Sequence, residues 1–389
     1  MRDLDPQTGA DMVHYLNNPP TTELGQLRAA NGHPEPYNVK YFMLGNEVWW
    51  PYTEFDLSAD RIVKQTVAFA QAMKTADPTI QIVFNPVNDA FPESFLRTDD
   101  PVQAPIIQKL GAFNEEIIPR TREYVDAVEF FQYGLAVGDG TVLPELDEEG
   151  WKYVMAHAYV LDKYDNADRH RAIADQYGPD TALIMGEFSG PAARLGGAIY
   201  DADYMIYLLN HAYDVFVSNW NLGLIETNYY GLIKQDVFQE RPPVRRPSFY
   251  VQKMFNNYFG DTIVATEIAD SPTFDVQERD TGEYLALPAA QNVPSLNAIA
   301  TTGDGKLYLM IVNRDLERDI EINVELNGFS PATEATVYVL NGPAIDATNE
   351  ENPENVTMRE ERLAGIADSF FYTVEKYSVT LITLTSAQK

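Results

Sequence analysis

The first 242 residues alternate short apolar runs with longer stretches of helical periodicity. Candidate strands cover residues 40–45, 80–84, 127–131, 182–185 and 215–220. Strands that alternate with helices in this way pair in parallel as βα units. The pattern therefore predicts about five βα units, which form part of a (β/α)8 TIM-type barrel.

The stretch 58–76 has the clearest helical pattern between these strands. Its apolar residues recur at helical spacing, Ser58 is placed to cap the N-terminus, and Asp77-Pro78 ends the helix. Residues 151–177 and 203–212 show similar patterns. We expect these helices to cover the parallel sheet.

A different pattern begins near Pro243, with short alternating runs separated by turn residues such as Gly303-Asp304-Gly305. Alternation of this kind predicts an antiparallel sandwich. We therefore divide the chain into a partial TIM-barrel domain, residues 1–242, and a C-terminal β-sandwich domain, residues 243–389. Its polar stretch 349–362 is predicted to be one long loop. The strands are expected at 306–312, 320–326, 336–340, 370–373 and 378–384.

A complete βα barrel has eight strands, more than this pattern supplies. Only residues 1–39 precede the first predicted strand, and within them 9–17 and 23–31 look helical or looped. Either the chain is a fragment of a longer gene product, or a partner subunit closes the sheet, or the sheet stays open with covered edges. Because an exposed parallel edge invites pairing, we expect a homo-oligomer that completes or covers the open barrel.

Composition narrows the possible partners. The chain has 389 residues, 45% of them hydrophobic, which is enough for one or two genuine cores. Its formal net charge of −30 argues against nucleic acid or anionic lipid as a partner. The acidic excess is typical either of adaptation to salty surroundings or of ordinary colloidal solubility.

The location of the protein is less constrained by sequence. No window approaches the roughly 18 consecutive apolar residues of a membrane span. The start, Met1 to Pro6, lacks the apolar stretch of a secretory signal. The absence of cysteine excludes disulfides and thiolate chemistry but is compatible with either compartment. We expect a cytoplasmic location slightly more than export of a processed chain.

Two glutamates, Glu47 and Glu187, each follow a predicted strand and a glycine. Loops at the carboxyl ends of barrel strands converge on one mouth, so the two carboxyl groups are expected to face each other. One such group protonates a departing glycosidic oxygen, while the other meets the positive charge at the anomeric carbon. The pair predicts a glycoside hydrolase. Competing carboxylates are Glu129, Glu226 and Asp89.

The stretch 24–47, which ends in Gly45-Asn46-Glu47, resembles the approach to the acid/base glutamate of glycoside hydrolase family 51. Gly186-Glu187-Phe188 resembles the Asp-Glu-Trp around the nucleophile of that family. In the β half, 311–314, 349–353 and 377–380 resemble its sandwich motifs. Most members of the family are α-L-arabinofuranosidases, and some are endoglucanases. The resemblance covers nearly the whole chain, except that the first three strands of the family barrel have no counterpart.

The resemblance implies a retaining double displacement, with Glu47 as acid/base and Glu187 as nucleophile. Glu47 then needs a raised pKa, which a second carboxylate nearby supplies. Asn46 is a candidate to contact the sugar 2-hydroxyl. Tyr133 matches a tyrosine that lies near the nucleophile in the family, and it is otherwise a core tyrosine.

Aromatic and amide side chains at the strand ends are further candidates for substrate contacts. Trp49 and Trp50 directly follow the acid, and Trp220 ends the last predicted strand, where aromatic rings stack on sugar faces. Asn85 and Asn219 stand at strand ends, where they either bond sugar hydroxyls or cap loops.

The chain also departs from the family pattern. Where the family reads Ser-x-His-x-Tyr, this chain has Glu129-Phe130-Phe131-Gln132-Tyr133, and Phe188 replaces the tryptophan after the nucleophile. An endo-acting β-glucanase or xylanase is therefore the alternative activity. A non-catalytic carbohydrate-binding remnant of a glycosidase is the alternative of another class. The five histidines show no His-Glu-x-x-His spacing, so neither a metal nor another cofactor is expected.

Overall fold

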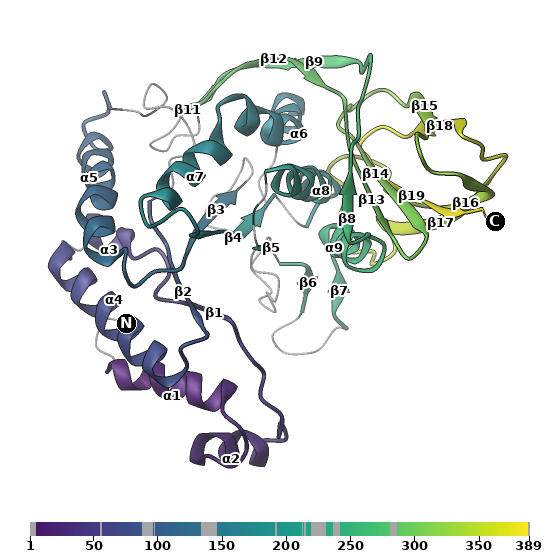
Figure 1. Cartoon of the computed structure of the whole chain (residues 1–389). Coiled ribbons are helices and arrows are strands. Elements are labelled where there is room, and N and C mark those ends of the chain that lie inside the picture. Colours follow the sequence, from purple (N-terminus) through teal and green to yellow (C-terminus); the bar gives the residue numbers. More distant parts are fainter. Residues whose placement is uncertain are drawn as a thin grey trace.

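A parallel sheet with its helices and a set of antiparallel sheets form the two halves of the molecule (Figure 1). The computed structural model describes residues 5–54, 57–87, 96, 98–133, 146–190, 193–211, 213, 215–218, 231–235, 242–280 and 286–387. All structural statements below concern these residues. The parallel half precedes the antiparallel half along the chain, as the sequence predicts.

The parallel sheet has its strands in chain order, β1-β2-β3-β4-β5, and every neighbouring pair is parallel. This order is the one that successive βα units produce. Each strand coincides with a predicted apolar run, and two of them extend further towards their carboxyl ends. The strands are β1 (Tyr41–Met43), β2 (Gln81–Phe84), β3 (Ala127–Tyr133), β4 (Ala182–Ser189) and β5 (Val215–Ser218).

Helix α4 (Ala59–Ala76) confirms the predicted cap and end. It begins after Ser58, whose hydroxyl accepts a hydrogen bond from the Arg61 N–H, and it ends at Asp77. Helix α1 (Pro6–Asn17) packs on α4 at Gly9, where an added Cβ would lie 2.9 Å from Phe69. Other helices of this half are α2 (Glu23–Ala30), α3 (Trp49–Glu54) and α5 (Ala104–Thr121).

Two predicted helices differ from those observed. The stretch 151–177 is two helices, α6 (Glu148–Lys163) and α7 (Asn166–Asp175), because Asp165 adopts a left-handed φ of 54° that breaks the helix. Helix α8 (Leu195–Asn210) begins before the predicted residue 203. Its first turn contains Gly196, whose Cα faces the Trp151 ring so closely that a Cβ would lie 2.2 Å from it. Tertiary packing thus overrides the low helix propensity of glycine.

The antiparallel half contains a six-stranded sheet in the order β17-β16-β19-β14-β13-β8, opposite the two-stranded sheet β15-β18. Inward residues of both sheets, among them Val337, Ile382 and Phe370, form one apolar cluster. This arrangement is the predicted sandwich, while the boundary at residues 242 and 243 stays a prediction. The strands are β8 (Thr262–Val264), β13 (Leu296–Gly303), β14 (Lys306–Asn313), β15 (Ile320–Glu325), β16 (Pro331–Asn341), β17 (Thr357–Ala364), β18 (Ser369–Val374) and β19 (Ser378–Ser386).

The prediction of one loop over 349–362 is wrong at its C-terminal end, because β17 begins at Thr357 and pairs with β16 along its whole length. β17 is an edge strand, and most of its side chains face solvent, so its sequence lacks the alternating pattern of an inner strand. Shorter elements complete the chain: β6 (Ile233–Lys234), β7 (Val244–Arg245), α9 (Pro247–Asn257), β9 (Thr273–Val276), β10 (Arg279–Asp280), β11 (Ala286–Leu287) and β12 (Ala290–Pro294).

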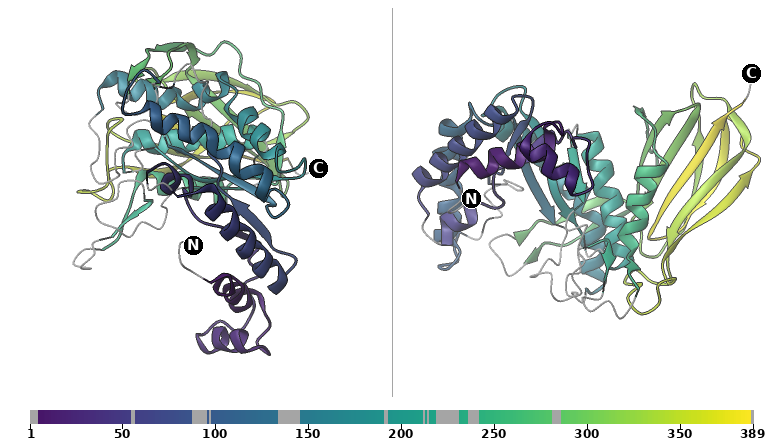
Figure 2. Two further views of the ribbon diagram at one scale, coloured as in Figure 1. Left: turned by 90° about the vertical axis from the view of Figure 1, so that its left-hand side faces the viewer. Right: turned by 90° about the horizontal axis from the view of Figure 1, so that it is seen from below.

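Helices α8 and α9 lie between the two halves, as Figure 2 shows. On α8, Asp203 is buried and accepts hydrogen bonds from Arg314 at 2.6 Å and from Asn297 at 2.8 Å. Arg246, at the start of α9, pairs with Glu350 at 2.8 Å. The two halves are thus joined by the buried Asp203–Arg314 ion pair as well as by apolar contacts.

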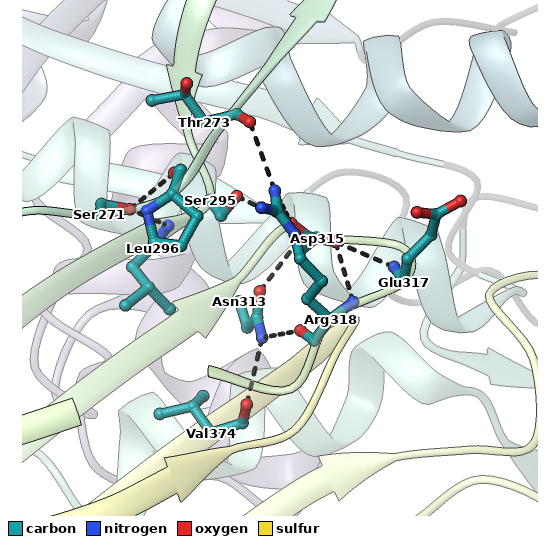
Figure 3. A network of polar contacts seen from close by, with 10 residues as sticks. Ser271, Thr273, Ser295, Leu296, Asn313, Asp315, Glu317, Arg318 and Val374 are labelled. Carbon is teal, nitrogen blue, oxygen red and sulfur yellow. Dashed lines mark hydrogen bonds and ion pairs between the residues drawn. The ribbon is translucent and has the colours of Figure 1, made fainter. Parts of the chain in front are cut away.

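Hydrogen bonds of Asn313 and Asp315 hold the turn after β14 (Figure 3). Asn313 donates hydrogen bonds to the backbone carbonyls of Arg318 and Val374 at 3.1 and 3.2 Å. Asp315 accepts from the hydroxyl of Ser295 at 3.0 Å and from the Arg318 backbone N–H at 2.9 Å. The 311–314 motif therefore stabilises the junction between the halves.

Candidate active site

Glu47 and Glu187 lie at the carboxyl-end side of the parallel sheet. Glu47 follows β1, and Glu187 lies within β4, which extends to Ser189 and past the predicted end at residue 185. Burial raises the pKa of the Glu47 carboxyl, and the negative charge of Glu187 raises it further. A charge raises the pKa of a neighbouring carboxyl group in this way only at short range. The two carboxyl groups therefore share one site, although 140 positions separate them in the chain.

The backbone is strained where it delivers Glu47 to the site. Gly45 has a φ of 87°, and Glu47 itself has a φ of 47°, in the left-handed region that few residues other than glycine adopt. Such a conformation costs on the order of 1 kcal/mol and is concentrated at functional sites. The turn explains why a glycine precedes the Asn46-Glu47 pair.

A third carboxyl group, Glu129 of β3, belongs to the same site. Its side chain is only 3% exposed. Burial raises its pKa to about 9, with further contributions from the charges of Glu187 and Glu47. From sequence alone, Glu129 is only one of several competing carboxylates. The available signal was a glutamate inside an otherwise apolar strand, where a buried charge is costly.

Gly186 makes room for this third carboxyl group. A Cβ at residue 186 would lie 2.0 Å from Glu129 Oε1, closer than any real contact. The pairing of β3 with β4 also shifts between Phe130 and Phe131, so that Phe131 lies opposite Glu187. An irregularity of this kind redirects side chains locally. The glycine before Glu187 is thus required by the neighbouring strand.

Asn85 and Trp49 link β2 to the turn after β1. The Trp49 indole N–H donates to Asn85 Oδ1 at 3.0 Å. Asn85 Nδ2 donates to both the backbone carbonyl and Oε2 of Glu129, each at 2.8 Å. Both amide hydrogens of Asn85 are therefore used inside the protein, while its contact with a sugar hydroxyl stays a prediction.

The other predicted substrate-binding residues have mixed outcomes. Asn46 is exposed beside Glu47, and Trp50 is 39% exposed with its ring centroid 5.8 Å from that of Trp49. Tyr133 lies on β3 in register with Ser189, but its side chain lies outside the described part of the structure. Asn219 and Trp220 lie outside the described residues, as do the competitors Asp89 and Glu226. Their roles stay predictions.

Two buried histidines adjoin β3 without forming a metal site. Burial lowers the pKa of His157 to about 4 and that of His170 to about 3, so both imidazoles are neutral at working pH. His170 stacks on Phe130 and bonds the Tyr213 hydroxyl at 2.7 Å, and His157 bonds Gln132 at 3.1 Å. The described residues contain no group of three or more potential metal ligands. Nor do they include a helix that is long and apolar enough to span a bilayer.

Two cavities in the described chain lie away from the glutamates. One, of about 520 Å³, lies between the helical layer and the sandwich and includes His211 and Arg314 in its lining. The other, of about 450 Å³, lies on the six-stranded sheet beside Tyr258 and Tyr338. Neither is lined by Glu47 or Glu187.

A parallel βα sheet that carries paired glutamates at its carboxyl ends, followed by an antiparallel sandwich, defines a glycoside hydrolase of the βα-barrel class. The α-L-arabinofuranosidase 1 domain matches residues 3–127, and the α-L-arabinofuranosidase C-terminal domain matches residues 186–378. The chain belongs to the arabinofuranosidase-like proteins of glycoside hydrolase family 51.

Individual relatives agree with this assignment. The α-L-arabinofuranosidase C of Emericella nidulans is 22% identical over 396 residues, covering 95% of this chain and 70% of the relative. The solved family 51 α-L-arabinofuranosidase of Thermotoga petrophila has a TM-score of 0.76 and 20% identity, covering 98% of this chain and 74% of that one. A bifunctional glucanase-xylanase from a metagenome library shares the fold with a TM-score of 0.63 and 16% identity. The match covers 98% of this chain and 68% of that one.

Proposed function

We propose that this glycoside hydrolase cleaves α-L-arabinofuranosyl bonds of plant-type polysaccharides or oligosaccharides with retention of configuration, using Glu47 as acid/base and Glu187 as nucleophile. The observation that carries the proposal is the effect of the Glu187 charge on the pKa of Glu47. Family membership and the arabinofuranosidases among its relatives support the sugar.

In the first step, a carboxylate oxygen of Glu187 bonds to the anomeric carbon while the glycosidic bond breaks. Glu47 gives its proton to the departing oxygen, and a glycosyl ester of Glu187 remains. In the second step, Glu47 takes a proton from water, the water oxygen bonds to the anomeric carbon, and Glu187 leaves as carboxylate. Atoms and charges balance over the cycle, and the configuration is retained.

The mutual influence of the two carboxyl groups suits this cycle. While Glu187 is ionised, its charge favours the protonated form of Glu47, as the first step requires. Once Glu187 is esterified, that charge is gone and the pKa of Glu47 falls. Glu47 then serves as the base for the second step.

The test combines a substrate panel with single substitutions. We expect the protein to hydrolyse an aryl α-L-arabinofuranoside and to release arabinose from arabinoxylan, and we expect Glu47→Gln and Glu187→Gln to abolish both activities. Turnover that both substitutions leave intact would reject the assignment. Binding of arabinoxylan without any turnover would favour the non-catalytic binder.

Azide distinguishes the two roles. With Glu187→Ala, azide takes the place of the nucleophile and yields a glycosyl azide of inverted configuration. With Glu47→Ala, azide attacks the glycosyl ester and yields a product of retained configuration. If Glu187→Ala instead gave the retained azide and Glu47→Ala the inverted one, Glu47 would be the nucleophile and Glu187 the acid/base.

An endo-acting β-glucanase or xylanase is the second candidate. The exposed Trp50 beside the acid favours it, because an open aromatic surface accepts an internal segment of a polysaccharide. Aryl β-glycosides and soluble β-glucan in the same panel separate the candidates. Shortening of β-glucan without release of arabinose from arabinoxylan would replace the first proposal by the second.

We also propose that the strands β1 to β5 are five βα units of an incomplete TIM-type barrel, and that a second copy covers an edge of the sheet. The support is that both edge strands are parallel strands with one neighbour each among the described residues. Light scattering that gives 43.8 kDa in dilute solution would contradict the oligomer. The net charge of −30 supports the absence of nucleic acid and membrane partners.

A further inference from the structure

Glu129 has no part in the double displacement, yet its side chain contacts elements that carry both site glutamates. It lies on β3, between β2 and β4 in the sheet. Asn85, the residue after β2, donates a hydrogen bond to one of its carboxyl oxygens, Oε2. The other, Oε1, is buried and has no hydrogen-bond partner among the described residues. An incompletely satisfied carboxyl group this deeply buried calls for an explanation.

On the β4 side, the contact is steric. Oε1, Cγ and Cδ of Glu129 all lie within 2.6 Å of the point where a Cβ of residue 186 would stand. The Glu129 carboxyl group therefore fills the space beside the backbone of Gly186. Glu187 is the next residue, so the position of its backbone depends on this contact.

On the β1 side, the contact is a chain of hydrogen bonds whose direction is fixed. The indole N–H of Trp49 is only a donor, so the Asn85 atom that it meets at 3.0 Å is the amide oxygen. The amide nitrogen of Asn85 then faces Glu129 and donates to it. Trp49 follows Glu47 by two residues, so Glu129 also holds the turn that carries the acid.

We propose that Glu129 is a positioning residue of the candidate active site, whose protonated carboxyl group holds Gly186 and the Asn85–Trp49 chain, and with them the nucleophile and the acid, in their working positions. The catalytic consequence of this inference rests on the proposed function. The position of the Glu129 carboxyl group does not depend on that function.

The protonated state follows from the surroundings. The charged groups that act on Glu129 are Glu187 on β4 and Glu47 after β1, both acidic, and burial adds to their effect, so its pKa rises to about 9. Asn85, just after β2, is uncharged, and its hydrogen bond only partly offsets this rise in the pKa of Glu129. An ionised Glu129 would place a third negative charge in the site, where Glu187 must itself ionise to attack. As a neutral acid, the group fills its space without competing with the nucleophile.

The placement is tested by the indole N–H signals of protein labelled with 15N-tryptophan, which contains 4 tryptophans. Trp49→Phe identifies the Trp49 signal. Between pH 7 and 10.5 we expect this signal to move with a midpoint near 9, because ionisation of Glu129 alters the bond from Asn85 to Trp49. Glu129→Gln should remove the titration, and Asp201→Asn, at another buried acid, should keep it. A stationary Trp49 signal, or a titration that persists in Glu129→Gln, would overturn the proposal.

The catalytic consequence is tested by a double-mutant cycle at residues 129 and 186. Gly186→Ala alone should lower kcat by about 100-fold, because its Cβ displaces either Glu129 or the nucleophile. Adding Glu129→Ala should recover at least tenfold, since the obstructing side chain is gone. If the losses in kcat from the two substitutions simply multiply in the double variant, so that nothing is recovered, the proposal is overturned. If the wild type shows no hydrolysis, the proposed function fails, while the indole titration still tests where Glu129 lies.

Discussion

Buried acidic side chains occur in two regions of this protein with opposite surroundings. At the junction of the two halves, the buried Asp203 meets Arg314 at 2.6 Å. At the candidate active site, the charges that act on Glu129 come from two other glutamates, and its only side-chain hydrogen bond among the described residues is from an uncharged amide.

The difference shows how the surroundings decide what a carboxyl group does. A guanidinium opposite a buried carboxylate favours the ionised form and holds two elements together. Acidic neighbours and burial favour the protonated form, which is the state that a general acid needs. The same residue types therefore join the halves in one region and supply chemistry in the other.

Among the substitutions in the two regions, Glu187→Gln is expected to have the largest effect on activity and little effect on stability. Loss of the nucleophile should lower kcat by at least about 10⁴-fold, while the free energy of unfolding should stay the same or rise, because one of the like charges is removed. Activity on an aryl arabinofuranoside and denaturant unfolding measure both effects. A clear loss of stability would place Glu187 among the structural carboxylates instead.

Arg314→Ala should produce the reverse pattern. It leaves Asp203 buried without its guanidinium, so the free energy of unfolding should fall by about 3 to 5 kcal/mol. Arg314→Met combined with Asp203→Leu should recover most of this loss, because no charge is then left unpaired. Urea unfolding of the single and double variants provides the comparison, and equal losses in both would contradict the pairing argument.

Asp201, fully buried on α8, should give stability a pH dependence. Burial raises its pKa from 3.8 to about 7, while its Oδ1 accepts from the Gly190 N–H at 3.0 Å. The folded state then binds more protons than the unfolded state between those values, so stability falls as pH rises from about 4 to about 7. The loss is about 4 kcal/mol at most.

Asp201→Asn removes this dependence and keeps an acceptor for Gly190. We expect the variant to be more stable than the wild type at pH 8, with the advantage shrinking steadily towards pH 4. Thermal unfolding across this range is the measurement. A constant difference between the two proteins would mean that Asp201 titrates normally.

The smallest effect is expected at the surface. Arg120 pairs with Asp60 at 2.6 Å, but the Asp60 side chain is 86% exposed. Such pairs contribute roughly 0 to 1 kcal/mol, and salt screens them. Arg120→Ala should therefore change the free energy of unfolding by about 0.5 kcal/mol or less. It serves as the matched control for Arg314→Ala.

Local signals allowed much of the fold to be predicted from sequence. Ser58 and Asp77 mark the ends of α4, and each strand of the parallel sheet coincides with an apolar run. The errors occur where distant contacts override local preference. Gly196 allows α8 to start early because it packs against Trp151, and β17 forms because β16 offers it an edge.

The sequence by itself determined the order of elements, the change from parallel to antiparallel structure, and the two glutamates that follow strands and glycines. Only the tertiary structure decided that Glu129 joins them, that Gly186 is required by Glu129, and that Asn85 binds Glu129 and Trp49. The reason is that periodicity and caps act between residues a few positions apart. A pKa, a steric gap or a hydrogen-bond partner instead depends on which side chains meet across neighbouring strands.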